Sequence, residues 1–192
     1  MAVWKIEEPE SFFLKSLPEL SLPSHPHKRL QHLAGRFLLQ HLRPDFPISR
    51  IQSAPGQKPF LSDNACHFSI SHTKNMAAAI ISNSQPVGID IEMITDKANK
   101  VCHKFLHASE IQWLGKVYQK IGPFHATLIW SIKETIFKWY GLGNVDFKND
   151  IQIHSLIEGK EENSAACFFK YANPPTFDAH YLKMDNMIVS WK

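Results

Sequence analysis

The strongest constraint on the fold of this chain is the order in which its hydrophobic patterns alternate between the spacing of helices and that of strands. From Ser24 to Pro44, apolar residues recur at the spacing of an α-helix, and we expect Ser24 to cap this helix and Pro44 to end it. Alternating or β-branched segments follow, and they predict three strands of one sheet: Cys66 to Ser71, Met76 to Ile81 and Val87 to Glu92.

Two further helical patterns and a second group of strands complete the chain. The first helix has Ser109 near its start and carries, on one face, Ile111, Leu114, Val117 and Tyr118. The second is predicted from about His125 to Tyr140, where Gly141 ends it. The remaining predicted strands are Phe147 to Ile153, Ala165 to Tyr171 and Ala179 to Trp191. This order of helix, strands, helices and strands indicates an α+β fold.

The composition is that of a globular protein. The chain has 192 residues, of which 44% are hydrophobic, enough to bury a sizeable core. Its apolar runs are far shorter than the roughly 20 residues of a membrane span, and acidic residues near the N-terminus are atypical of a signal peptide. The three cysteines are far apart and form no Cys-x-x-Cys pair, which argues against a disulfide framework or a zinc knuckle. We expect a cytoplasmic protein that binds neither membranes nor nucleic acid.

Two carboxylates in the segment Val87 to Glu92 are the first candidates for chemistry. Because side chains alternate along a strand, Asp90 and Glu92 lie on one face, roughly 7 Å apart along it. Carboxylates that face one spot repel each other unless a cation lies between them. Magnesium takes one or two protein carboxylates while phosphate and water complete its shell. The alternative is that both residues belong to the solvent face of an edge strand.

The helix predicted from His125 to Tyr140 carries a second candidate group. Glu134 and Lys138 are four residues apart and therefore share a face of this helix. They either belong to a reactive site or form a surface ion pair that contributes about 0.3–0.5 kcal/mol. In the second case, Lys133 is another solvated charge.

A third group combines a hydroxyl, an imidazole and several cations. Ser71 and His72 end a predicted strand at a turn, which is a suitable position for holding phosphate, although such a histidine can instead cap a neighbouring element. Lys58 lies on a proline-flanked loop. Further positive charge on the first helix comes from Lys28, Arg29 and Arg36. The formal net charge of +3 is compatible with a polyanionic ligand or an acidic partner, but it establishes neither.

Together, these segments resemble the signature motifs of the 4'-phosphopantetheinyl transferase superfamily, of its monomeric, surfactin-synthetase-activating type. The motifs are Gly-x-Lys-Pro at Gly56 to Pro59, Phe-x-Ile-Ser-His-Ser/Thr at Phe68 to Thr73, Gly-x-Asp-x-Glu at Gly88 to Glu92 and Trp-Ser-x-Lys-Glu-x-x-x-Lys at Trp130 to Lys138. All four occur in the order of the family, over residues 25 to 145. A weaker agreement pairs Phe105-Leu106 with Ser109-Glu110. The joint match is far more specific than any single motif.

The resemblance implies a reaction and a role for each candidate residue. The chain would transfer the 4'-phosphopantetheine group of coenzyme A to a serine of an acyl or peptidyl carrier protein and release adenosine 3',5'-bisphosphate. Asp90, Glu92 and Glu134 would bind Mg²⁺, or Mn²⁺ in its place, and Glu134 or a metal-bound water would accept the serine proton. Lys138 would orient the reacting phosphate. The residues implied to bind coenzyme A are Lys58, Ser71, His72, Lys28 and Arg36.

The family fold implies two similar α+β halves, residues 1–95 and 96–192, related by a pseudo-twofold with the active site in the cleft between them, in a monomer. Two other classes of protein stay open. A metal-dependent phosphatase or nuclease would use Asp90, Glu92 and Glu134 without a carrier protein, but the sequence has no P-loop and no His-Asp pair of the HD type. A non-catalytic binding domain would be expected to lack a metal ligand, and here all three are present.

Overall fold

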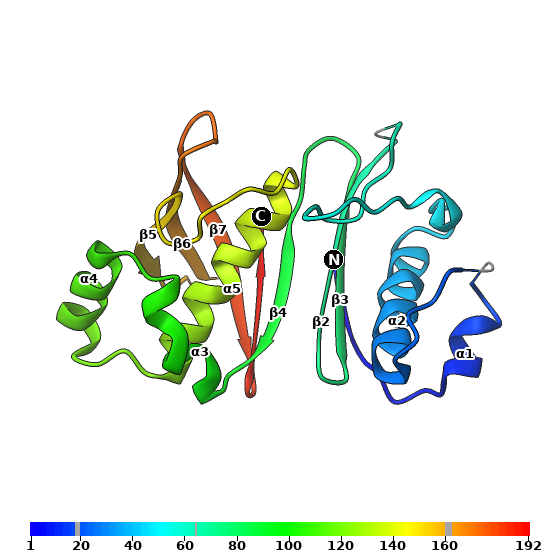
Figure 1. Cartoon of the computed structure of the whole chain (residues 1–192), viewed down its shortest axis with the longest axis horizontal. Coiled ribbons are helices and arrows are strands. Elements are labelled where there is room, and N and C mark those ends of the chain that lie inside the picture. The colour runs from blue at the N-terminus through cyan, green and yellow to red at the C-terminus, as the bar shows by residue number, and fades with distance from the viewer. Residues whose placement is uncertain (18–19, 64, 160–162) are drawn as a thin grey trace. The chain divides into compact units, whose positions relative to one another are not determined.

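The computed structural model describes residues 1–17, 20–63, 65–159 and 163–192, and its elements form two sheets with helices packed on them (Figure 1). In chain order the elements are β1 (Ala2–Lys5), α1 (Glu10–Leu14), α2 (Pro26–Leu42), η1 (Ile48–Arg50), β2 (His67–Thr73), β3 (Met76–Ser82), β4 (Ile89–Met93), α3 (Asp96–Val101), η2 (Cys102–Lys104), α4 (Ala108–Tyr118), α5 (Pro123–Tyr140), β5 (Ile151–Ile157), β6 (Asn163–Phe169), β7 (Thr176–Met184) and β8 (Met187–Trp191). The predicted α+β class is confirmed.

The chain divides into two compact units. The first contains Met1–Ile91 and Lys138–Leu142, and the second contains Glu92–Phe137 and Gly143–Lys192. The strand β4 and the helix α5 therefore each contribute residues to both units. The boundary at residue 95 and the pseudo-twofold that we expected from the family stay predictions.

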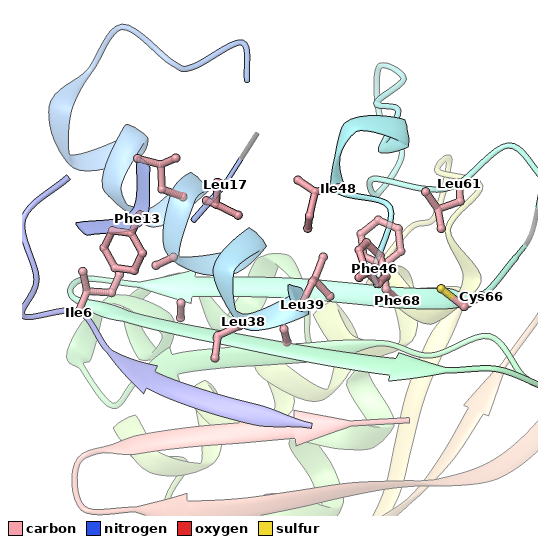
Figure 2. Packing of buried hydrophobic residues seen from close by; sticks show 14 residues of the cluster. Ile6, Phe13, Leu17, Leu38, Leu39, Phe46, Ile48, Leu61, Cys66 and Phe68 are labelled. Carbon is pink, nitrogen blue, oxygen red and sulfur yellow. The ribbon is translucent and has the colours of Figure 1, made fainter. Parts of the chain in front are cut away.

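The first unit is a three-stranded sheet of order β1-β3-β2 with α2 packed against it. Figure 2 shows the core between them, where Phe13 of α1, Leu38 and Leu39 of α2 and Phe68 of β2 are buried. The helix approaches the sheet closely at Gly35, because a Cβ there would lie 2.6 Å from the Cγ2 of Ile70. A glycine at this position allows the backbone of α2 to rest almost directly on β2.

The second unit is built on a five-stranded sheet of order β4-β8-β7-β6-β5. Helix α5 is tied to this sheet through Ser131 and Thr135, whose hydroxyls both bond Ser190 of β8, at 2.8 and 2.7 Å. All three residues are buried, so this small hydroxyl cluster fixes the position of α5 on the sheet. Among the described residues, no helix is both long and apolar enough to cross a membrane.

Several expectations about individual elements are wrong in detail. The N-cap of α2 is His25, not Ser24, and its side chain makes no capping bond. β4 belongs to the second sheet, so the three predicted strands do not form one sheet. On the predicted face of α4 only Leu114 is buried. The segment Phe147 to Ile153 becomes a strand only from Ile151.

The remaining elements agree closely with the sequence patterns. Helix α2 ends at Leu42, two residues before Pro44, and α5 ends just before Gly141. The segment Ala179 to Trp191 is an exception, because it is not one continuous strand: β7 ends at Met184, the chain turns, and β8 begins at Met187. The sequence patterns did not identify β1, α1 or α3.

Candidate active site

Asp90 is the centre of a buried polar cluster in the first unit. The hydroxyl of Ser71 on β2 donates to Oδ1 of Asp90 at 2.8 Å, and the Nζ of Lys138 on α5 lies 2.6 Å from the same oxygen. Nζ also donates to the Ser71 hydroxyl at 2.9 Å. The Ser71 oxygen accepts a further bond from the backbone N–H of Ile91, at 3.3 Å. Three residues that the sequence placed in three different motifs thus form one hydrogen-bonded group.

The second oxygen of the Asp90 carboxylate is the unusual feature of this cluster. Asp90 is only 3% exposed, and its Oδ2 is buried without a hydrogen-bond partner. Burying a carboxylate oxygen without a partner is costly, so such an atom calls for a specific explanation. An oxygen of this kind, with a negative charge and spare lone pairs, suits a hard cation. The solvent-facing alternative for Asp90 is therefore wrong.

Basic residues gather along α2 and β2 of the same unit. A cavity of about 400 Å³ is lined by Lys28, His32, Arg36 and His72 among others. Arg36 is 9% exposed and donates to the backbone oxygen of His32 at 3.4 Å. Burial lowers the pKa of Arg36 to about 10, which leaves the guanidinium charged at neutral pH. No carboxylate among the described residues forms an ion pair with it, so Arg36 offers its charge to an anion in the cavity.

The histidines of this cavity are held neutral. Burial, followed by the positive charge of Arg36, lowers the pKa of His32 to about 4. Burial and then the ammonium of Lys138 lower the pKa of His72. At neutral pH both rings therefore act as hydrogen-bonding groups. Arg29, in contrast, is bound to Glu10 at 2.6 Å, so its charge is already paired.

Lys58 is positioned by a backbone oxygen and a glycine. Its Nζ donates to the carbonyl of Val87 at 2.7 Å, just before the Gly-x-Asp-x-Glu motif. Its stem passes over Gly141, where a Cβ would lie 3.2 Å from the Lys58 Cε. Gly141 also has a φ of +77°, a conformation that ends α5 and favours glycine. Burial lowers the pKa of Lys58 to about 8.

Glu92 belongs to the second unit, where an aromatic group holds it. The indole N–H of Trp130 donates to its Oε1 at 3.3 Å. The Trp130 ring contacts Phe105 and Phe147, with ring centroids 5.1 and 5.4 Å away. Beside Glu92 lies a pocket of about 240 Å³ whose wall includes Met93, Val101, Phe105 and Trp130. The carboxylate of Glu92 therefore stands at the edge of a mainly apolar pocket.

Lys133, next to Glu134 in the last motif, has a structural position. It is completely buried, so the alternative in which Lys133 is a solvated charge is wrong. Its Nζ lies 2.7 Å from Oε2 of Glu110 and also bonds three backbone oxygens. The sequence signal for Glu110 was the weak motif agreement at Ser109-Glu110. Nothing in the sequence connected Glu110 with Lys133.

The metal-ligand assignment divides between the two units. Asp90 belongs to the first, whereas Glu92 and Glu134 belong to the second. Along the chain, Glu92 follows Asp90 by two residues on β4, and Glu134 precedes Lys138 by one turn of α5. No group of three or more His, Cys, Asp or Glu within the described part of the chain is placed to hold a metal ion. The buried, unpartnered Oδ2 of Asp90 nevertheless fits a divalent cation, because Mg²⁺ is commonly bound by one or two carboxylates and substrate phosphates.

Several known proteins are similar in sequence to this chain. The chain is 40% identical over 86 residues to the 4'-phosphopantetheinyl transferase gsp of Aneurinibacillus migulanus. This alignment covers 45% of this chain and 35% of gsp. The chain is 29% identical over 128 residues to the 4'-phosphopantetheinyl transferase AcpT of Escherichia coli O157:H7. This alignment covers 59% of this chain and 59% of AcpT. A putative 4'-phosphopantetheinyl transferase of Haemophilus influenzae is 26% identical over 172 residues, which covers 78% of this chain and 71% of that one.

Several of these alignments span only part of the relatives. The chain covers 35% of gsp, 47% of the Salmonella typhi enterobactin synthase component D and 59% of AcpT. The sequence model of the 4'-phosphopantetheinyl transferase superfamily matches residues 86–185, which is more than half of the chain. This range includes the carboxylates of β4 and the last turns of α5, and on that match the chain belongs to the 4'-phosphopantetheinyl transferase superfamily.

Proposed function

We propose that this protein transfers the 4'-phosphopantetheine group of coenzyme A to a serine of an apo acyl or peptidyl carrier protein, with Mg²⁺, and releases adenosine 3',5'-bisphosphate. The observation that carries the proposal is the environment of Asp90. A buried carboxylate keeps one oxygen unpartnered and has the Lys138 ammonium on the other. A site that positions a cation and a phosphate together needs a negative and a positive group side by side.

The proposed metal ligands are Asp90, Glu92 and Glu134, with Mn²⁺ as an alternative ion. A divalent ion bound there would neutralise the pyrophosphate of coenzyme A as charge develops in the transition state. Ser71 orients Asp90 through its hydroxyl, and Trp130 orients Glu92 through its indole N–H. These bonds fix the direction of each carboxylate, as hydrogen bonds to metal ligands commonly do.

The reaction is a phosphoryl transfer, in which positioning and charge neutralisation do most of the catalysis. The carrier serine forms a bond to the β-phosphorus, and the bond to the leaving adenosine 3',5'-bisphosphate breaks. Glu134 accepts the serine proton in this proposal, and Lys138 holds a phosphate oxygen. Lys138 suits this role because its ammonium is a compact charge on a flexible stem.

The basic cavity of the first unit supports the binding of the nucleotide end of coenzyme A. Arg36 supplies a charged guanidinium without an ion-pair partner among the described residues, and Lys28 lies exposed at the same cavity. His72 adds a neutral ring to this cavity, and Lys58, elsewhere in the first unit, adds a third cation. We assign the 3'-phosphate to Arg36, since a fork of N–H groups matches phosphate oxygens. The apolar pocket beside Glu92 suits the pantetheine arm, whose dimethyl group and amides carry no charge.

The proposal is tested by measuring the intact mass of an apo carrier protein after incubation with this protein, coenzyme A and Mg²⁺. We expect the carrier to gain one phosphopantetheine group and a chelator to prevent the gain. Carrier proteins of fatty-acid, polyketide and peptide synthesis should be tried in parallel. An unchanged mass for all three classes, at enzyme concentrations close to those of the carrier, would contradict the proposed reaction.

The location and assembly of the protein are part of the same proposal. We expect a monomer that works in the cytoplasm, where coenzyme A and carrier proteins meet. Light scattering during size-exclusion chromatography should give a mass close to the 22.0 kDa of one chain.

A further inference from the structure

The contact between Lys138 and Asp90 has a consequence for how a metal ion reaches its site. Oδ1 of Asp90 already accepts bonds from Lys138 and from Ser71, at 2.6 and 2.8 Å. Oδ2 is buried and has no hydrogen-bond partner. Neither oxygen of the carboxylate is open to an ion from solution. A neighbouring group has to move before a cation can bind Asp90.

Of the two described side chains that bond Asp90, that of Lys138 is the less constrained. Ser71 is 5% exposed, lies in β2 and is fixed by the backbone N–H of Ile91. The Lys138 side chain is 18% exposed, against 4% for that of Asp90, and among the described residues its ammonium bonds Ser71 and Asp90. A four-carbon stem with several rotatable bonds can swing outward without any change in the helix that carries it.

We propose that Lys138 and the metal ion compete for Asp90, and that bound coenzyme A decides the competition by offering the Lys138 ammonium a phosphate instead. This inference rests on the proposed function, because it takes Asp90 as the metal ligand. An ammonium and a divalent cation on one carboxylate repel each other at a separation of a few ångströms. Metal binding to the protein alone is therefore weak, and coenzyme A strengthens it by drawing Lys138 away.

The competition makes metal and coenzyme A binding mutually dependent. Linkage requires that, if coenzyme A raises the affinity for the metal, the metal raises the affinity for coenzyme A by the same factor. In this proposal the Lys138 ammonium has two positions, one on Asp90 and one on a phosphate of coenzyme A. Both the metal and coenzyme A favour the second position. The arrangement keeps the ion out of the site until the substrate whose phosphates it must bind is present.

The test is to titrate the protein with Mg²⁺, by calorimetry, in the presence and absence of coenzyme A. Mn²⁺ detected by electron paramagnetic resonance gives a second readout of the same site, and neither measurement depends on activity. Lys138→Met removes the competing charge. We expect this variant to bind Mg²⁺ alone more tightly than the wild type, within the about 5- to 150-fold range of typical coupling between sites. The strengthening by coenzyme A should shrink by a similar factor.

Two variants separate the removal of the competing charge at Asp90 from a general loss of positive charge and from the loss of the metal ligand itself. Lys58→Met also removes one partly buried positive charge from the first unit, but its Nζ bonds the carbonyl of Val87 and not Asp90. It should leave the affinity for Mg²⁺ alone unchanged. Asp90→Asn should abolish Mg²⁺ binding. If Lys138→Met unfolds by circular dichroism, Lys138→Gln replaces it, since the amide keeps a donor without the charge.

The outcomes are distinct for the inference and for the proposed function. If Asp90→Asn abolishes Mg²⁺ binding and Lys138→Met binds the ion no more tightly than the wild type, the competition is refuted and the metal site stands. If Asp90→Asn binds Mg²⁺ as the wild type does, the metal assignment fails and the competition fails with it. Tighter binding by Lys138→Met but not by Lys58→Met supports the inference.

Discussion

Lys133 and Glu110 form an ion pair that has no contact with solvent. Nζ of Lys133 lies 2.7 Å from Oε2 of Glu110, and both side chains are 0% exposed. Nζ also bonds the backbone oxygens of Phe105, Phe147 and Ile151, each at 2.8 Å. Glu110 accepts two backbone N–H groups as well, from His107 at 2.7 Å and from residue 153 at 2.8 Å. The pair therefore joins α5 to α4, to the segment before α4 and to β5.

This pair gives the first prediction, which concerns stability. Lys133→Met leaves Glu110 buried without its counter-ion, and breaking a buried pair in this way typically costs about 3–5 kcal/mol. We expect a loss of that size in the free energy of unfolding, measured with urea. The matched control is Lys116→Met on the exposed surface of α4, which should change stability by less than about 0.5 kcal/mol.

A double-mutant cycle shows whether the loss belongs to the pair. Glu110→Gln keeps an oxygen for one of the two backbone N–H groups and removes the charge. In combination with Lys133→Met it should cost clearly less than the sum of the two single changes, because neither charge is then left alone. Additive losses would mean that the ion pair itself contributes little and that packing explains the effect.

The sequence predicted those elements whose pattern is local. Strands β2 and β3 were visible because their segments alternate or are rich in β-branched and small apolar residues, and α5 was visible because its apolar residues recur at helical spacing and Gly141 gives a stop signal. The assignment of β4 to the second sheet was not visible, since strand pairing depends on contacts between residues far apart in the chain. The buried state of Lys133 was hidden for the same reason: its partner Glu110 lies 23 residues away, and lysine is usually exposed.

The candidate site was found by motif order and not by chemistry of single residues. The sequence grouped Asp90 with Glu92 and Lys138 with Glu134, but it gave no sign that Lys138 bonds Asp90 directly or that the Ser71 hydroxyl bonds both of them. The resemblance implied only that Ser71 binds coenzyme A, and in the structure its hydroxyl bonds the side chains of both Asp90 and Lys138. Contacts across 67 and 48 residues of sequence cannot be read from local spacing.

The second prediction concerns the indole of Trp130. Trp130→Phe keeps most of the ring but removes the N–H that bonds Glu92, so this carboxylate loses an orienting partner. Losing such a partner of a metal ligand typically lowers metal affinity about 10- to 100-fold, and we expect the same here for Mg²⁺ in the presence of coenzyme A. The control is Trp113→Phe, which removes an indole bond to the backbone oxygen of Ile153. It should lower stability by about 1 kcal/mol and leave Mg²⁺ affinity unchanged.

Gly141 gives a third prediction, in which two glycines are compared. Gly141→Ala and Gly56→Ala both place a side chain at a positive φ, of +77° and +72°, which costs roughly 1–2 kcal/mol. Only at Gly141 does the new methyl group meet another residue, the Cε of Lys58, at 3.2 Å. Both variants should lose similar stability, but only Gly141→Ala should weaken the binding of coenzyme A. Equal affinities for the two variants would show that Lys58 does not depend on this contact.

Arg36 gives a fourth prediction, about which part of the nucleotide it recognises. Arg36→Met removes a charged donor whose hydrogen bonds are worth about 1.5–3 kcal/mol, so the affinity for coenzyme A should fall roughly 10- to 150-fold. The affinity for 3'-dephospho-coenzyme A should hardly change, because the group that Arg36 binds is absent from it. Arg50→Met is the control, since Arg50 pairs with Asp63 at the surface. If both nucleotides lose affinity equally in Arg36→Met, the 3'-phosphate assignment is wrong.

The last prediction is a pH dependence that arises from Lys58. Burial lowers the pKa of this ammonium to about 8, from an ordinary value of 10.5. Below pH 8 the side chain is charged and attracts phosphate, and as the pH rises through 8 it loses its proton. The affinity for coenzyme A should therefore fall between about pH 8 and pH 10. A site whose lysine kept the ordinary pKa of 10.5 would retain most of its affinity over the same range.

Two variants test the origin of this fall. Lys58→Arg keeps its charge throughout the range, because a guanidinium titrates far above it, so the affinity should stay level across pH 8. Lys58→Met should bind coenzyme A more weakly at pH 7 and show no fall at higher pH. The two curves should approach each other at high pH, since the wild-type side chain is then as neutral as methionine. A wild-type curve that is flat through pH 8, or a fall that persists in Lys58→Met, would assign the titration to another group and remove Lys58 from the phosphate site.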